Sequence, residues 1–179
     1  MLKKIVSVCS SFYHSFKDWQ LFLFLFIITI FIRFPFFFRD YVDRDESTFI
    51  LMAQSWVDGH LPYTQLWDLK PPVTFLYFAL VIFTFGKSYF AIRLGGVLLV
   101  SCTSFFTYKI GRNIAPKKVA FWSALILIAL QSLFGSVQGV MSEHISMAFF
   151  MMGIYFTFFA AQKPYPFLGG LFLGLTLMS

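Results

Sequence analysis

Asp45 and Glu46 are adjacent carboxylates that follow Arg44 and precede the pattern "STFILMAQSWV". Six of the eight acidic residues lie between positions 39 and 72, so most of the acidity is concentrated in one segment. A carboxylate held at a helix start can remove a proton from a hydroxyl group. The alternative is that both acids are solvated and only stabilise a first helical turn, by about 0.3–1 kcal/mol. The pair alone leaves both interpretations open.

Lys70 ends the same acidic segment, immediately before Pro71 and Pro72. Its long side chain could anchor a helix start at the membrane surface. Asp68 is two residues away and can act as its partner. Arg93 lies in an apolar stretch, where a charge is costly; it is either a functional residue or marks the end of a helix.

Glu143 and His144 form a second polar point, in "GVMSEHISM". They are candidates for acceptor-binding or orienting groups that face the same site. The alternative is a helix that begins at Ser142, for which the sequence offers no Ser-x-x-Glu capping box. A divalent-metal site built from this pair and an aspartate is the weaker interpretation, because the ligand spacing is unspecific. We therefore expect no metal and no cofactor.

The composition indicates an all-α integral membrane protein. Hydrophobic residues make up 59% of the chain and charged residues only 12%, whereas soluble domains have about a quarter charged residues. The apolar runs are continuous rather than alternating, which favours helices over a β-barrel. We expect a polytopic helical bundle.

The apolar runs divide the chain into four parts. Residues 1–18 are predicted to be a cytoplasmic lead-in, and residues 19–38 a first transmembrane helix. Residues 39–72 would then form an external loop of a catalytic type. Residues 73–179 hold the further apolar segments 73–86, 89–108, 119–135, 145–161 and 167–179. The last of these segments extends to Ser179, so we expect the sequence to be the N-terminal portion of a longer protein.

The orientation of the later segments has two solutions. If every segment crosses the membrane, the basic turn that contains Lys109 and Lys118 lies outside, against the positive-inside rule. If segment 73–86 enters the membrane and returns, that turn is cytoplasmic and Glu143 emerges on the same side as Asp45. The sequence slightly favours the second solution.

A short interfacial helix is expected inside the 39–72 loop. Phe49, Met52, Ala53 and Trp56 follow helical spacing and would form one apolar stripe. Asp45 is expected to cap the start of this helix, and Gly59 to end it.

The pattern "DRDESTF…W…GHLPY…LWDLKPP" after a single N-terminal span resembles the first external loop of GT-C membrane glycosyltransferases. The resemblance is to the protein mannosyltransferase and aminoarabinose transferase group, including the lipopolysaccharide-type glycosyltransferases of family 39. It continues through "AIRLGGVLLVSCTSFFTYKIGR" and "MSEHISM". In that group an Asp-Glu pair opens the loop and a Lys-Pro pair closes it, as Asp45-Glu46 and Lys70-Pro71 do here.

This resemblance implies an inverting glycosyltransferase of the bacterial cytoplasmic membrane, with the 39–72 loop outside. The donor would be a sugar on a polyprenyl phosphate, and the acceptor a hydroxyl of a lipid, a glycan or a protein. Asp45 would be the base, with Glu46 in the same catalytic site. Lys70 and Arg93 would bind the donor phosphate, and Asp68, Glu143 and His144 would orient the reactants.

Other functions are weaker alternatives. A non-catalytic fragment or assembly partner is consistent with a chain that stops inside a helix. A transporter or flippase would call for internal repeats and charges near the bilayer midplane, and the chain has neither pattern. The net charge is +6, and most basic residues lie beside apolar segments. We therefore expect the basic residues to contact membrane lipids rather than nucleic acid.

Overall fold

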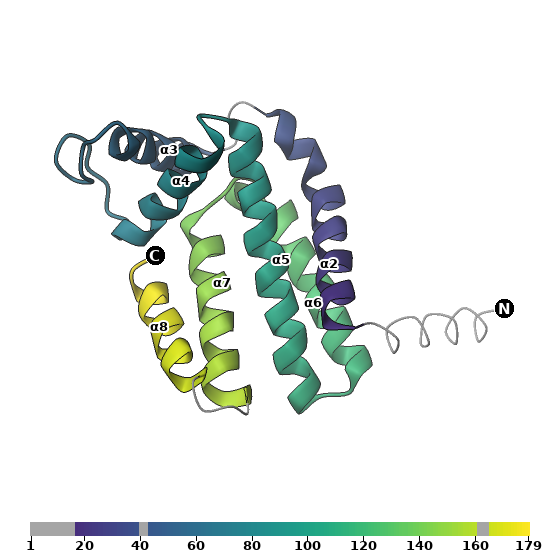
Figure 1. Cartoon of the computed structure of the whole chain (residues 1–179). Helices are drawn as coiled ribbons and strands as arrows, with labels where there is room; N and C mark the ends of the chain where they lie inside the picture. The colour runs from purple at the N-terminus through teal and green to yellow at the C-terminus, as the bar shows by residue number, and fades with distance from the viewer. Residues whose placement is uncertain (1–16, 40–42, 161–164) are drawn as a thin grey trace.

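The computed structural model describes residues 17–39, 43–160 and 165–179. Within them all regular structure is helical (Figure 1). In chain order the elements are α2 (Asp18–Arg33), the 3₁₀ helix η1 (Phe34–Phe38), α3 (Arg44–Val57), α4 (Pro72–Phe85), α5 (Tyr89–Ile114), α6 (Lys117–Leu133), the 3₁₀ helix η2 (Gly135–Gln138), α7 (Ser142–Ile154), the π-helical turn η3 (Tyr155–Phe159) and α8 (Tyr165–Leu177). Most of the expected lead-in 1–18, and Asp40 in the loop, lie outside the described residues.

Helices occupy every apolar segment that the sequence predicts. The first expected span, 19–38, is α2 followed directly by η1, where Pro35 stands at the first turn of the tighter helix. Together they form one of two described helices that are long and apolar enough to cross a membrane, Asp18–Phe38 and Tyr89–Ile114. The second of these, α5, continues six residues beyond the predicted end at 108; Tyr108 is buried there and Lys109 pairs with Asp18.

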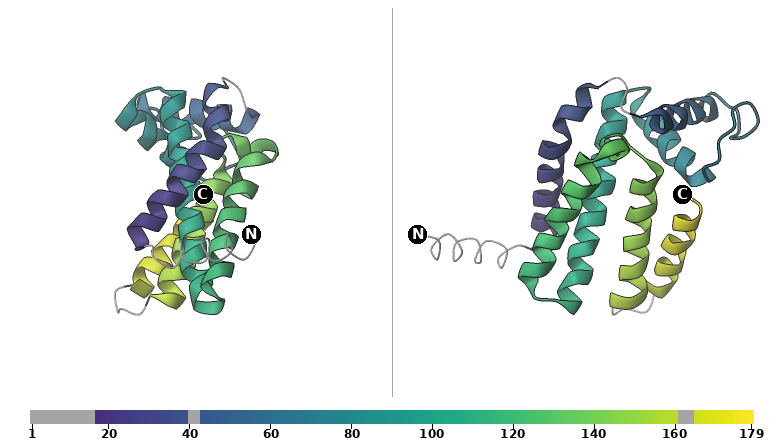
Figure 2. Two further views of the ribbon diagram at one scale, coloured as in Figure 1. Left: turned by 90° about the vertical axis from the view of Figure 1, so that its right-hand side faces the viewer. Right: turned by 180° about the vertical axis from the view of Figure 1, so that it is seen from behind.

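α5 is the central helix of the bundle. α2 and α6 pack on one side of it and α7 on the other, with α8 outside α7 (Figure 2). Two apolar clusters hold this arrangement. One joins α2, α5 and α6 through residues such as Leu25, Val100 and Ile128. The other joins α3, α4, α5 and α7 through residues such as Phe49, Phe78 and Ile145.

α3 and α4 form a separate packed pair at one end of the bundle (Figure 1). The predicted stripe on α3 is confirmed: Phe49, Met52 and Ala53 are buried and Trp56 packs against them. This stripe faces α4, where Phe49 contacts the rings of Phe75 and Phe78. Gly59 follows the helix with a φ of +99°, as expected for a residue that ends it.

Long-range contacts show which segments lie together at each end of the bundle. Lys109 Nζ lies 2.7 Å from Asp18 Oδ2, so the α5–α6 turn lies beside the start of α2. We call this the basic end; it carries Lys109, Arg112, Lys117 and Lys118. At the opposite end, Val140 contacts Glu46 and Glu143 contacts Lys70. α4 therefore does not connect the two ends, and Glu143 lies on the same side as Asp45.

Candidate functional site

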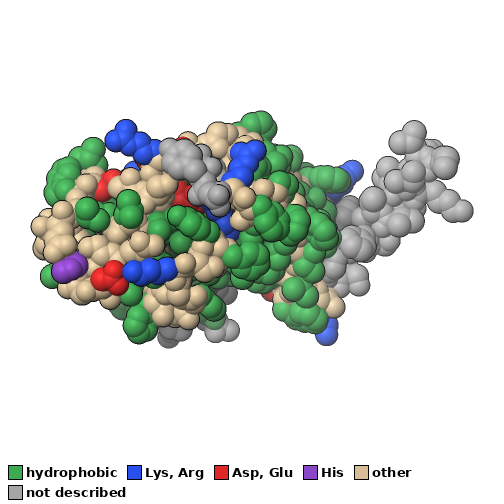
Figure 3. Space-filling view, turned by 90° about the horizontal axis from the view of Figure 1, so that it is seen from above, with side chains coloured by type: hydrophobic (Ala, Val, Ile, Leu, Met, Phe, Trp, Pro, Cys, Tyr) green, Lys and Arg blue, Asp and Glu red, His purple; other side chains and the backbone are tan. Residues whose placement is uncertain are grey.

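Asp45, Asp68 and Lys70 line one open pocket of about 320 Å³, together with Trp67 and Leu69. Asp45 comes from the first turn of α3, and the other residues come from the loop that leads into α4. The structure thus brings together three of the seven residues singled out in the sequence. Figure 3 views this end of the molecule and shows acidic and basic side chains among hydrophobic ones.

Asp43 fixes the helix start that carries Asp45. Its side chain accepts a hydrogen bond of 2.9 Å from the Asp45 N–H, and its extended backbone makes it the N-cap of α3. The expectation that Asp45 itself is the cap is therefore wrong, because the helix begins at Arg44, two residues earlier than a cap at Asp45 would allow. The consequence is chemical: the Asp45 carboxylate is exposed in the first turn and is not used in capping.

The backbone of Lys70 is held from both sides. Its N–H donates to Asp68 Oδ1 at 2.9 Å, and its carbonyl accepts from the Tyr63 hydroxyl at 2.6 Å. Burial, and then the Asp68 carboxylate, raise the pKa of Tyr63, so its hydroxyl remains a donor at neutral pH. Tyr63 also has a φ of +67°, a strained conformation for a residue with a side chain.

The Lys70 ammonium group reaches toward α7. Its Nζ lies 3.5 Å from Glu143 Oε1, and both side chains are partly exposed. Exposed pairs of this kind are worth little, about 0–1 kcal/mol, so a stronger anion can displace Glu143. His144, the next residue, lies differently. It is buried, its Nδ1 accepts from the Met141 N–H and its Nε2 lies 2.9 Å from the Gln131 carbonyl oxygen. His144 therefore stabilises the start of α7 and does not line the pocket.

Glu46 and Arg93 form a buried ion pair away from the pocket surface. Arg93 Nη2 lies 2.8 Å from Glu46 Oε2, and both side chains are at most 3% exposed. Glu46 Oε1 also accepts from the Val140 N–H at 2.7 Å. Burial raises the pKa of Glu46, and Arg93 and the Val140 N–H oppose this rise. The pair ties the first turn of α3 to α5 and to the segment before α7.

Arg33 organises the backbone of that same segment. At the end of α2 its guanidinium donates to four carbonyl oxygens, those of Gln131, Val137, Gln138 and Gly139, at 2.6–3.2 Å. Gly139, the last of these four residues, also packs closely against Glu46. A Cβ atom added at Gly139 would lie only 3.1 Å from the Glu46 carboxyl carbon. Arg33 therefore holds the segment against which Glu46 packs.

The sequence missed three residues of this site. Asp43 was hidden because three acids lie within four positions, and only the backbone shows which one is the cap. Tyr63 is of a residue type that favours the membrane surface, and nothing in its sequence neighbours indicates a contact with Lys70. Arg33 could be recognised as a charge near a span end, but its partners lie about a hundred positions later. Within residues 17–39, 43–160 and 165–179, no three metal-ligating side chains form a cluster.

Comparison with known proteins shows which family the chain belongs to. The family model of dolichyl-phosphate-mannose-protein mannosyltransferases matches residues 69–179, which include Lys70, Arg93, Glu143 and His144. The match begins after Asp45 and Glu46. Searches of the curated proteins and of the solved structures gave no match. Since the family model covers more than half of the chain, the protein belongs to the dolichyl-phosphate-mannose-protein mannosyltransferase family of GT-C membrane glycosyltransferases.

Proposed function

We propose that this protein transfers a sugar from a polyprenyl-phosphate donor to a hydroxyl acceptor at the membrane surface, with inversion at the anomeric carbon. One observation carries the proposal: Asp45 and Lys70, a carboxylate and an ammonium group, line the same pocket. A glycosyl transfer of this type needs a base at one side of the anomeric carbon and a cation at the other.

The reaction would proceed in one displacement. The acceptor hydroxyl gives its proton to the Asp45 carboxylate as its oxygen bonds to the anomeric carbon. The bond from that carbon to the phosphate oxygen breaks, and the electron pair leaves with the polyprenyl phosphate. The phosphate changes from a diester to a monoester and gains negative charge. Lys70 stabilises this developing charge, which is the part of the reaction where a cation contributes most.

Five further residues would support these two groups. Asp68 and Glu143 orient Lys70, through its backbone N–H and its ammonium group respectively. Glu46 and Arg93, buried against each other, would position the helix start that carries Asp45. The buried pair thus supports a positioning role, in place of the direct contacts with substrate and phosphate expected from the sequence. His144 would position Glu143 through the start of α7.

The distribution of basic residues supports one side of the membrane for the pocket. Lys109, Arg112, Lys117 and Lys118 lie at the basic end, opposite the pocket. Because positive residues favour the cytoplasmic side, this distribution supports a pocket on the outer face of the cytoplasmic membrane. A lipid or a glycan hydroxyl would meet the donor there.

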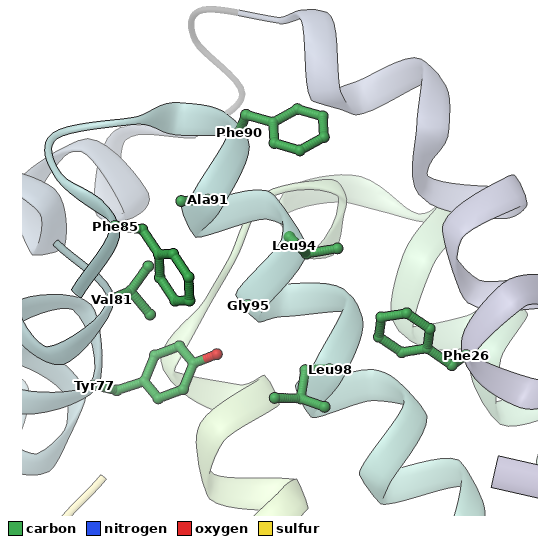
Figure 4. Close-up of a pocket in the computed structure, with 9 residues that line it drawn as sticks. All are labelled: Phe26, Tyr77, Val81, Phe85, Phe90, Ala91, Leu94, Gly95 and Leu98. Carbon is green, nitrogen blue, oxygen red and sulfur yellow. The ribbon is translucent and has the colours of Figure 1, made fainter. Parts of the chain in front are cut away.

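A place for the hydrocarbon chain of the donor lies between α2, α4 and α5. An apolar pocket of about 450 Å³ is lined by Phe26, Tyr77, Val81, Phe85, Phe90, Ala91, Leu94, Gly95 and Leu98 (Figure 4). The Tyr77 hydroxyl is the polar side-chain group that points into it. α4 begins two residues after Lys70, so one short helix connects the phosphate contact to this pocket.

The test is a pair of substitutions in one helix start. Asp45→Asn, nearly isosteric, is expected to abolish transfer from a polyprenyl-phosphate sugar while membrane insertion and thermal stability stay unchanged. Asp43→Asn is the matched control: it removes a carboxylate two residues away, but asparagine still caps the helix. We expect the control to retain transfer. Activity of Asp45→Asn equal to that of the control would eliminate Asp45 as the base.

A further inference from the structure

A second pocket with a different chemistry lies at the basic end, far from Asp45. Its larger part, about 520 Å³, is lined by aromatic side chains, with Asp18 and Lys109 at one edge. Its smaller part, about 180 Å³, adds Arg112 and Asn113. Both parts share Lys109, Tyr155 and Phe159, so they adjoin each other between the end of α5 and η3, and we describe them together as one pocket.

The cations of this pocket are held in place. Lys109 Nζ is paired with Asp18 Oδ2 at 2.7 Å and lies 5.7 Å from the centre of the Tyr155 ring. The guanidinium of Arg112 lies 5.7 Å from the centre of the Tyr108 ring. Asn113 donates from its amide to the Lys109 carbonyl at 2.7 Å. An ammonium group has three donors, so Lys109 can contact Asp18 and a second anion together.

The pocket wall is shaped by an unusual helical turn. η3, Tyr155–Phe159, is π-helical, and the Ala160 N–H bonds to the Tyr155 carbonyl oxygen at 3.0 Å. Such turns are rare and are frequently found at functional sites. Here the turn supplies Tyr155 and Phe159 to the pocket lining, and α5 supplies the cations together with Phe105 and Phe106. The aromatic wall is therefore formed by both elements, and the cations come from α5.

The pocket lies where a lipid headgroup would meet the protein. Lys109 and Arg112 stand in the last turns of α5, one of the two helices long enough to cross the membrane. Lipid phosphates lie at the level where such a helix leaves the membrane, and lysine and arginine there are attracted to an anionic membrane surface. An arginine fork also matches the oxygens of a phosphate. The aromatic wall can accept the glycerol and upper acyl part of the same molecule.

We propose that this pocket binds the phosphate headgroup of one anionic phospholipid from the leaflet at the basic end. Lys109 and Arg112 contact the phosphate, and Tyr155 and Phe159 pack against the adjoining glycerol and acyl chain. The site is independent of the proposed transfer reaction, because none of its residues lines the pocket of Asp45 and Lys70.

The experiment measures binding of phosphatidylglycerol and of phosphatidylcholine to the full chain in detergent by native mass spectrometry. Wild type is expected to retain one phosphatidylglycerol in preference to phosphatidylcholine. Arg112→Gln is expected to weaken phosphatidylglycerol binding by several fold, and the Lys109→Gln, Arg112→Gln double variant by roughly tenfold or more. Arg112 is exposed, so its single variant keeps the test valid if the double variant fails to fold.

Two controls separate this site from general attraction to charge. Lys118→Gln removes a cation at the same end that lines neither part of the pocket, and it should leave binding unchanged. Excess inorganic phosphate should not displace the lipid, because it lacks the part that packs on the aromatic wall. Equal losses in Lys118→Gln and Arg112→Gln would overturn the proposal. Displacement of the lipid by inorganic phosphate would overturn it as well.

Discussion

Glu46 Oε2 and Arg93 Nη2 lie 2.8 Å apart, buried between α3 and α5, while Asp45 is exposed at the neighbouring position. Successive residues of a helix point about 100° apart, so adjacent carboxylates cannot face the same place. Here one faces the bundle and the other faces the pocket. The Asp-Glu pair therefore has one member suited to chemistry and one suited to holding the helix.

Removing one member of the Glu46–Arg93 pair is expected to destabilise the protein strongly. Glu46→Gln or Arg93→Met leaves a buried charge without its partner, which typically costs about 3–5 kcal/mol. The double variant removes both charges and should lose less than the sum of the single variants. Thermal unfolding in one detergent measures all three. Additive losses would show that the two groups do not depend on each other.

Lys70→Gln should reduce turnover more than binding. The substitution keeps the backbone contacts with Asp68 and Tyr63 and removes only the ammonium group. If Lys70 stabilises the leaving phosphate, kcat should fall by about 10²–10³-fold. Steady-state kinetics with a polyprenyl-phosphate sugar provides the measurement. Lys87→Gln is the control, since Lys87 is also paired with an aspartate but lies outside the pocket. Unchanged kcat in Lys70→Gln would refute this role.

Gly139→Ala tests the packing behind Glu46. The new methyl group would lie 3.1 Å from the Glu46 carboxyl carbon, so the Arg33-bound segment or the carboxylate has to move. We expect a loss of about 1–3 kcal/mol in stability, as for other overpacked sites. Gly170→Ala is the matched control: nothing lies within 4 Å of its new methyl group, and alanine favours helix by up to about 1 kcal/mol. Opposite shifts in the unfolding temperature are expected; equal shifts would contradict the packing argument.

Ala91→Phe should weaken the use of long-chain donors. The phenylalanine ring would fill part of the apolar pocket that Ala91 lines with α2, α4 and other residues of α5. Losing the burial of about two CH₂ groups, at roughly 0.8 kcal/mol each, would raise KM for a long polyprenyl donor about tenfold. KM for a short, water-soluble donor should stay the same. Leu130→Phe, on an exposed face of α6, is the control. The same change in KM with both donors would show that the hydrocarbon chain of the donor does not bind in this pocket.

The sequence predicted the helices well because apolar runs bounded by Pro and Gly carry a strong local signal. It also placed Asp45 and Lys70 in one segment, which the fold closes into a pocket. What it did not reveal are the contacts between distant residues. Arg93 is paired with Glu46, forty-seven positions earlier, and His144 bonds to Gln131 rather than facing the pocket. Periodicity shows which face of a helix is apolar, but it does not show which polar group on another helix meets it.

The contacts of Arg33 would also set an order for membrane insertion if α2 is a span, as its length and hydropathy allow. Residues 131–139, which supply the four carbonyl oxygens, are synthesised about a hundred positions after Arg33. Until then a charge with an insertion cost of about 2.5–3.5 kcal/mol would have no protein partner from that segment. Its place at the last turn of α2 would let the side chain reach the headgroups in the meantime. The segment between α6 and α7 would then complete the contacts of a helix that is already inserted.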